Sequence, residues 1–85
     1  GSLIFEGEYL NGERNGKGKS YDYNNEINYE GEYLNGEKHG KGISYWEGKL
    51  LFKGEYRTGK KWDGQGYDRN NNIVFELKQG KGYIK

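Results

Sequence analysis

The sequence predicts an all-β protein: a single elongated, twisted antiparallel sheet in which β-hairpins follow one another as an open-ended repeat array. Two observations lead to this prediction. The segment YEGEYLNG at residues 29–36 recurs as FEGEYLNG at residues 5–12 and as FKGEYRTG at residues 52–59. Its first aromatic residue recurs every 23 or 24 residues, at Phe5, Tyr29, Phe52 and Phe75, and a period of this length is typical of repeat architectures.

The first unit predicts a pair of strands. Phe5, Gly7 and Tyr9 fall on one face of an extended chain and the residues between them on the other, which is the period of a β-strand. Residues 11–16 are rich in Asn and Gly, which tolerate the positive φ of tight turns. Residues 17–23 then return as the second strand.

The next two units repeat this order of strand, turn and strand. In the second unit the turn is expected at residues 35–40, and Glu47-Gly48 closes a further hairpin. The third unit turns at Thr58-Gly59 and has one residue more before Gly64-Gln65-Gly66 than the other units have before their Gly-x-Gly elements. We therefore expect a bulge or a wider loop at residues 61–63.

The fourth unit is degenerate. Leu77 stands where the other units have glycine, Gln79 stands in place of a tyrosine, and the turn is shortened to residues 80–82. With this unit the chain predicts eight strands in an antiparallel meander.

We accordingly divide the chain into one repeat array over residues 1–85. Its units cover residues 5–28, 29–51 and 52–74, with a partial unit at 75–85. We interpret Gly1-Ser2, which lacks an initiating Met, as a cloning scar.

The aromatic residues are the predicted core, although only 31% of the chain is hydrophobic. Each recurring glycine lies between two aromatics on the same strand face and leaves room for a neighbouring ring. Because a single sheet has no second layer, the rings must cover one another across strands. We expect this ladder to contain Phe5, Tyr9, Tyr29, Tyr33, Phe52, Tyr56 and Phe75, together with Tyr21, Tyr45 and Tyr67 or rings near them.

The opposite face is expected to be charged. Cross-strand ion pairs there would fix strand register and keep the sheet soluble, at about 0.2 to 1 kcal/mol for each exposed pair. The acidic residues expected on this face are Glu6, Glu8, Glu30, Glu32, Glu55 and Glu76. The basic residues expected there are Arg14, Lys17, Lys19, Lys38, Lys41, Lys60, Lys61 and Lys81.

The repeated pattern resembles a known family. Aromatic-x-Gly-x-aromatic-x-x-Gly, followed closely by Gly-x-Gly, is similar to the MORN repeat (membrane occupation and recognition nexus), and residues 5–18, 29–42 and 52–66 match it. Gly48-Lys49-Leu50 after Tyr45-Trp46 also looks like the MORN variant found in bacterial proteins. The resemblance implies a row of β-hairpins within a larger protein, used for protein-protein association, self-association or peripheral membrane attachment, and it implies no catalytic residues.

Several functions are disfavoured by the residues that are present. There is no cysteine, and we expect the single histidine, His39, to be a solvated turn residue, so no metal site, nucleophilic catalysis or cofactor is predicted. A net charge of +1 argues against nucleic-acid binding. No apolar run is long enough to span a membrane. We expect a non-enzymatic protein without a small-molecule substrate, in a soluble, cytoplasmic or peripheral membrane location.

The preferred functional hypothesis is an interaction scaffold. The aromatic face would accept a protein partner, or the open edge strands would pair with a second copy. Trp62 stands out because it interrupts an otherwise polar turn. The predicted partner contacts are Tyr9, Tyr33, Tyr56, Trp46 and Trp62.

Two alternatives remain open at this point. Basic turns carrying Arg14, Lys38, Lys60 and Lys61 would suit the surface of an anionic membrane. Aromatic-rich hairpin repeats also occur in cell-wall and glycan-binding modules, but the two tryptophans of this chain do not recur at equivalent positions.

Overall fold

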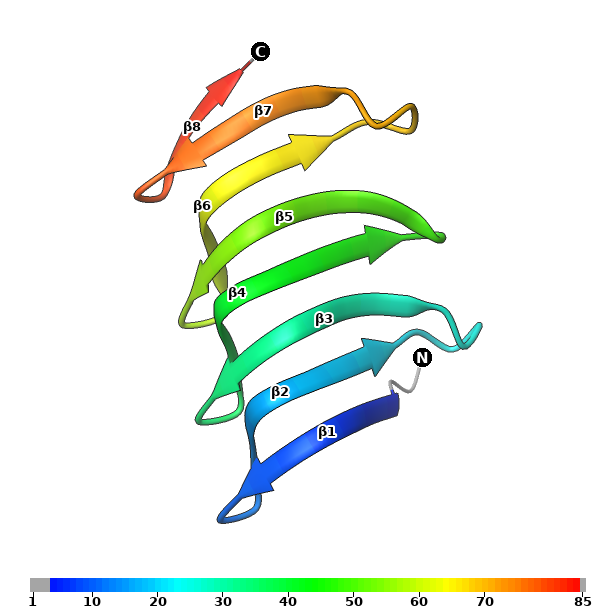
Figure 1. The fold of residues 1–85 in the computed structure, drawn as a ribbon, viewed down its shortest axis with the longest axis vertical. Helices are drawn as coiled ribbons and strands as arrows, with labels where there is room; N and C mark the ends of the chain where they lie inside the picture. Colours follow the sequence, from blue (N-terminus) through cyan, green and yellow to red (C-terminus); the bar gives the residue numbers. More distant parts are fainter. Residues whose placement is uncertain (1–3, 85) are drawn as a thin grey trace.

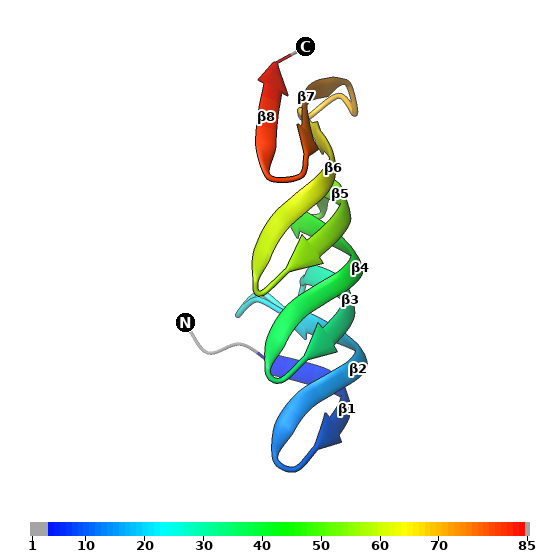
Figure 2. The same cartoon turned by 90° about the vertical axis from the view of Figure 1, so that its left-hand side faces the viewer.

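The computed structural model describes residues 4–84 as one antiparallel sheet whose eight strands follow chain order (Figure 1). The molecule is a single twisted layer (Figure 2) and measures 40 × 29 × 17 Å. This architecture confirms the predicted fold class. None of the described residues form a helix of the length and apolarity that would cross a membrane. The strands are β1 (Ile4–Leu10), β2 (Glu13–Tyr21), β3 (Ile27–Leu34), β4 (Glu37–Trp46), β5 (Lys49–Arg57), β6 (Lys60–Tyr67), β7 (Ile73–Lys78) and β8 (Lys81–Ile84).

A row of glycines crosses the sheet and sets the register of its strands. Glycine faces glycine at every junction from β1 to β6, and the row stops at Leu77 in β7. A Cβ placed on Gly31 would lie 2.5 Å from the Cα of Gly42 and 2.7 Å from the Tyr29 hydroxyl. Side chains are therefore excluded from this row on the face that carries the rings. The row consists of Gly7, Gly18, Gly31, Gly42, Gly54 and Gly64.

The core is the predicted aromatic ladder, and it joins each unit to the next. Within the second unit, the rings of Tyr29 and Tyr33 meet edge to face at 5.3 Å. The first ring of one unit also packs on the second ring of the following unit, at 5.1 Å for both Phe5–Tyr33 and Tyr29–Tyr56. Edge-to-face pairs at this distance contribute beyond the area they bury. The buried rings are Tyr29, Tyr33, Phe52 and Tyr56.

Small residues on the even strands make room for the rings. Ser20 and Ser44 stand opposite Tyr29 and Phe52, and their buried hydroxyls bond to the hydroxyls of Tyr33 and Tyr56. For Ser20 and Tyr33 the two oxygens are 2.6 Å apart.

The prediction that Tyr21, Tyr45 and Tyr67 belong to this ladder is wrong. Tyr21 and Tyr45 each follow a serine that points to the ring face, so strand alternation places them on the opposite face. The Tyr21 hydroxyl accordingly donates to Glu6 Oε1 at 3.1 Å, and the Tyr67 hydroxyl donates to Gln65 Oε1 at 3.2 Å.

The irregularity expected at residues 61–63 is confirmed, but its alignment with the other units is corrected. Gly64 pairs with Gly54, so it occupies the glycine row as Gly18 and Gly42 do. Gly64-Gln65-Gly66 therefore corresponds to Gly18-Lys19-Ser20, and the return strand of the third unit is one residue shorter than its counterparts. Only Trp62 is left without a Cα partner there, between Lys61 and Asp63.

The first two units have a wider bulge in place of this single residue. In the first unit, residues 15–17 all lie between the Tyr9–Arg14 pair and the Gly7–Gly18 pair, opposite Glu8. The second unit repeats the arrangement opposite Glu32. Bulges bend a strand. Because Arg14 and Gly18 are four positions apart, alternation is kept across this one, whereas the single unpaired Trp62 of the third unit shifts it.

Candidate functional site

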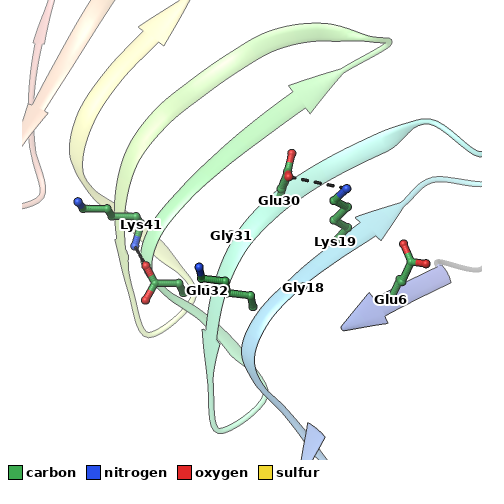
Figure 3. Close-up of a pocket in the computed structure, with 8 residues that line it drawn as sticks. Glu6, Gly18, Lys19, Glu30, Gly31, Glu32 and Lys41 are labelled. Atoms are coloured by element: carbon green, nitrogen blue, oxygen red, sulfur yellow. Dashed lines mark hydrogen bonds and ion pairs between the residues drawn. The ribbon is translucent and has the colours of Figure 1, made fainter. Parts of the chain in front are cut away.

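One face of the sheet is covered by its own rings and the other is uncovered, so the uncovered face is the first candidate surface. We call it the charged face, because its central row places Glu6, Lys19 and Glu30 level on three neighbouring strands. Lys19 Nζ lies 3.9 Å from Glu30 Oε2, which bears out the expected cross-strand pairing at this position. Figure 3 shows this pair with the charged side chains around it.

A hollow of about 440 Å³ lies on this face between β1 and β4. Charged side chains of alternating sign surround it, and the backbone of Gly18 and Gly31 forms part of its lining (Figure 3). The charged residues around it are Glu6, Lys17, Lys19, Glu30, Glu32 and Lys41.

Two of the repeated glutamates have a structural role. Glu8 and Glu32 accept hydrogen bonds from the backbone N–H groups of Lys17 and Lys41, at 3.0 and 3.2 Å. Each carboxylate thereby forms a hydrogen bond to the backbone of the three-residue bulge on the neighbouring strand. Their recurrence in successive units follows from this role and does not indicate a pair of catalytic carboxylates.

Apolar side chains form a second row on the charged face. The register places exposed Ile4 level with the half-buried ring of Tyr21, and exposed Ile73 level with that of Tyr67. Leu51 and Val74, also exposed, are the residues left unpaired at the register shifts beside Phe52 and Phe75, and Leu51 lines a hollow together with Tyr67.

Trp46 lines a second hollow, of about 420 Å³, near the turn between β4 and β5. The ring is 66% exposed and lines the hollow together with Leu50, Leu51 and Tyr67. Four charged residues complete the lining: Glu47, Lys49, Asp68 and Arg69.

The predicted partner contacts separate into buried and accessible residues. Tyr33 and Tyr56 are 5% and 4% exposed, so their rings belong to the core. Tyr9 is 59% exposed because no ring of a preceding unit packs on it within the described residues. Trp62 is half-buried: the Arg57 guanidinium lies 4.4 Å from its ring centre, and the ring borders Gly80.

Three of the predicted lipid contacts lie on the ring face, which corrects their expected place on the charged face. Arg14, Lys38 and Lys61 pair with Tyr9, Tyr33 and Tyr56 and share their face. For Arg14 and Lys38 this follows from simple alternation, whereas for Lys61 the unpaired Trp62 shifts the alternation by one residue. Their charged ends lie 4.3, 4.8 and 5.2 Å from the ring centres of Phe5, Tyr29 and Phe52. The fourth, Lys60, is exposed at a turn.

Burial on the ring face shifts several pKa values. Desolvation lowers the pKa of Lys38 and of Lys61, and the charge of Lys61 lowers the pKa of Lys38 further. Desolvation also raises the pKa of the Tyr29 and Tyr56 hydroxyls. These shifts reflect a packed core covered by cations.

The hairpin turns along one edge differ in charge, a feature that the sequence prediction did not use. We call the turns at residues 11–12, 35–36, 58–59 and 79–80 tips 1 to 4; they lie along the left edge of the sheet in Figure 1. Leu34 and Glu37 flank tip 2, whereas Arg57 and Lys60 flank tip 3 at the same positions. In the sequence, this difference in charge is visible as the change from YEGEYLNG at residues 29–36 to FKGEYRTG at residues 52–59.

Residues 4–84 contain no group of three or more His, Cys, Asp or Glu residues able to hold a metal ion.

Comparison with known proteins identifies the repeat. A family model described as the MORN repeat matches residues 5–26 and 29–49, which together make up about half of the chain. Comparisons with curated proteins and with solved structures gave no match. The matched ranges are the first two units, and the third and fourth units are those that depart from the shared geometry.

Proposed function

Because the chain belongs to the MORN repeat family, we propose that it is a non-enzymatic scaffold that binds a protein partner through its charged face, as one part of a larger protein. The observation that supports this proposal is the apolar row on the uncovered face. Exposed Ile4 lies two positions from Glu6, which is level with Lys19, and exposed Leu51 and Val74 lie two positions from Lys53 and Glu76, which flank Gln65. Apolar residues bordered by charge are typical of protein interfaces.

The distribution of rings supports the charged face over the ring face. The rings of the second and third units are nearly inaccessible, and cations cover them from outside. A partner that approached the ring face would meet these cations before any aromatic surface. In contrast, Trp46 and Leu51 are exposed and line a hollow together with Tyr67 of the charged face.

The proposal can be tested by capture with a surface variant. In a pull-down, the double variant Leu51→Lys, Val74→Lys should fail to capture proteins that the wild-type chain captures, because each lysine places a charge in the apolar row. A matched control, Asn24→Lys, Asn70→Lys, adds the same charge at exposed turns and should retain them. Retention of the same proteins by both variants would contradict the proposal.

Self-association at the outer edge of β1 is a second candidate, favoured by the environment of Tyr9. Tyr33 and Tyr56 each have a ring of the preceding unit and a serine hydroxyl as partners. Among the described residues, the ring of Tyr9 packs only on the Phe5 ring of its own unit, at 5.3 Å. A strand from a second copy would place a ring and a hydroxyl group against Tyr9. Sedimentation velocity over a range of concentrations tests this candidate. If the wild-type chain dimerises through this edge, Tyr9→Ser should abolish the dimer. A wild-type chain that stays monomeric would exclude self-association.

A further inference from the structure

We infer that tips 3 and 4 together form a binding site for a short acidic segment of a partner protein. The inference rests on the proposed scaffold function, but it uses a different surface from the charged face, so the two can fail separately. Five basic residues belong to these tips: Arg57, Lys60 and Lys61 at tip 3, and Lys78 and Lys81 at tip 4.

The charge at these tips departs from the rest of the array. Tips 1 and 2 each combine one glutamate with one basic residue, Glu13 with Arg14 and Glu37 with Lys38. In tip 3 a lysine takes the place of the glutamate. The positive charge is therefore concentrated at one end of the edge, although the chain as a whole has a net charge of only +1.

The two tips are fixed to each other by Trp62. Its carbonyl oxygen accepts a hydrogen bond from the Gly80 N–H at 2.9 Å, and its ring borders Gly80. The neighbouring Asp63 Oδ1 accepts a hydrogen bond from the Gln79 N–H at 2.8 Å. The cations of the two tips are thus held on one rigid base, which lowers the entropic cost of binding.

A division of roles in the third unit makes this arrangement possible. In the first two units one residue, Arg14 or Lys38, covers a ring with its side chain and bonds the next tip with its carbonyl. In the third unit Lys61 covers Phe52, while Trp62 bonds the next tip. The Trp62 side chain is therefore free to pack between the tips and to support Arg57.

The five cations lack carboxylate partners within the described part of the chain. The one ion pair within 4.0 Å there joins Lys19 and Glu30 on the charged face. Asp63, the acidic residue nearest in the chain to Lys61, is engaged by the Gln79 N–H. An acidic ligand would therefore not have to break an ion pair within 4.0 Å among the described residues, although Glu37 Oε2 lies near Gly59 of tip 3 and Asp63 lines a hollow with Lys78 and Lys81.

The size and surroundings of the site favour a protein segment over a bilayer. Tips 3 and 4 are two strands apart, which corresponds to about 10 Å. Acidic side chains a few residues apart in an extended segment, at about 3.3 Å per residue, would span that distance. Insertion of the tips into a bilayer would need an exposed aromatic or apolar side chain among the cations, in addition to the attraction of about 1 kcal/mol per basic residue at an anionic surface. Here Trp62 is covered by Arg57, and the exposed Leu10 and Leu34 belong to the neutral tips.

The test is a binding measurement with a fluorescein-labelled hexaglutamate peptide, followed by fluorescence anisotropy in low-salt buffer. The double variant Arg57→Leu, Lys60→Glu gives tip 3 the flanking residues of tip 2, which the fold already accommodates. We expect it to weaken the affinity at least about tenfold, equivalent to about 1.4 kcal/mol. The reciprocal variant, Leu34→Arg, Glu37→Lys, extends the basic run to tip 2 and should strengthen binding.

A matched control separates the site from net charge. The triple variant Tyr23→Glu, Asn24→Glu, Asn70→Glu lowers the net charge by the same three units at exposed turns on the opposite edge. It should bind the peptide nearly as well as the wild-type chain. Equal losses in this control and in the tip 3 variant would overturn the inference, as would unchanged binding by the tip 3 variant.

Two further outcomes would also overturn the inference. The first is no binding of hexaglutamate by the wild-type chain in low salt. The second is binding to phosphatidylserine-containing vesicles, lost in the tip 3 variant, without binding to the peptide; this result would assign the tips to a membrane surface. Capture through the charged face does not depend on either result, so the scaffold proposal stands or falls on its own test.

Discussion

Ser20 and Tyr33 share a buried hydrogen bond of 2.6 Å between their hydroxyl oxygens, and this bond connects one repeat unit to the next. Ser20 belongs to the return strand of the first unit, whereas Tyr33 belongs to the first strand of the second. The equivalent bond between Ser44 and Tyr56 connects the second unit to the third. The core of this protein is thus made at junctions between units.

Removing the Tyr33 hydroxyl should destabilise the protein. In Tyr33→Phe the buried Ser20 hydroxyl loses its partner, which costs about 1 to 3 kcal/mol. Tyr33→Ala also opens a cavity in the ladder and should cost about 3 to 5 kcal/mol. Urea unfolding followed by circular dichroism measures both. The control Tyr9→Phe removes an exposed hydroxyl and should leave the midpoint unchanged; equal effects at both positions would contradict this account.

The glycine row should not tolerate a methyl group. In Gly31→Ala the new Cβ would lie 2.5 Å from Gly42 Cα, and the backbone cannot move away without breaking the strand pairing. We expect a loss of about 1 to 3 kcal/mol from overpacking. The control Gly82→Ala places its Cβ 3.6 Å from Leu77, an ordinary contact, and should be nearly neutral. Thermal unfolding of the two variants provides the comparison.

Alkaline pH should unfold the protein through its buried tyrosines. Burial raises the pKa of Tyr29 and Tyr56 above the ordinary value of 10.0. The folded state therefore keeps protons that the unfolded state releases, so the stability is fully present below pH 10 and is lost as the pH rises above it. Absorbance at 295 nm, which reports tyrosinate, should increase together with the loss of circular dichroism. Ionisation of all tyrosines in a folded chain would refute the prediction.

Removing the charge of Lys61 should change the pKa of Lys38, which desolvation and this neighbouring charge lower together. Because the charge of Lys61 contributes to the lowered pKa of Lys38, Lys61→Met should raise the pKa of Lys38 toward 10.5. Methionine keeps an unbranched side chain over Phe52 and removes only the charge. NMR titration of the Lys38 side-chain carbons measures the shift. The control Lys17→Met, on the charged face, should leave this pKa unchanged.

The sequence was sufficient to predict the fold because its pattern is repeated. Alternation within YEGEYLNG defines the strands, Asn-Gly defines the turns, and each recurring glycine marks the row on which the strands align. The pairing of glycine with glycine across the sheet agrees with this pattern. The aromatic core followed from the same repetition, since Tyr29, Tyr33, Phe52 and Tyr56 were all expected in it.

Two errors of the sequence analysis concern the segments around the bulges. Arg14 and Lys38 were grouped with Lys17 and Lys19 on the charged face, although alternation from Gly18 and Gly42 assigns them to the ring face, where they pair with Tyr9 and Tyr33. The alignment of the third unit was also misjudged. Gly64 was counted with the bulge glycines, Gly16 and Gly40, whereas its pairing places it in the glycine row. Counting residues cannot distinguish a deleted bulge residue from an inserted one.

Placing the contact residues required the three-dimensional arrangement. Tyr9, Tyr33 and Tyr56 occupy equivalent positions in the sequence, yet only Tyr9 is accessible. The difference depends on whether a preceding unit covers the ring, which no local pattern encodes.

The bond between Ser20 and Tyr33 has a practical consequence for dividing this protein. The sequence period suggests cutting the chain between residues 28 and 29, where one unit ends. Such a cut would separate Ser20 from Tyr33 and Phe5 from Tyr33, so neither piece would retain that part of the core. The smallest autonomous folding segment should therefore span two consecutive periods. Truncations should keep β2 with β3 and β4 with β5, and a single excised period should behave as an unfolded peptide.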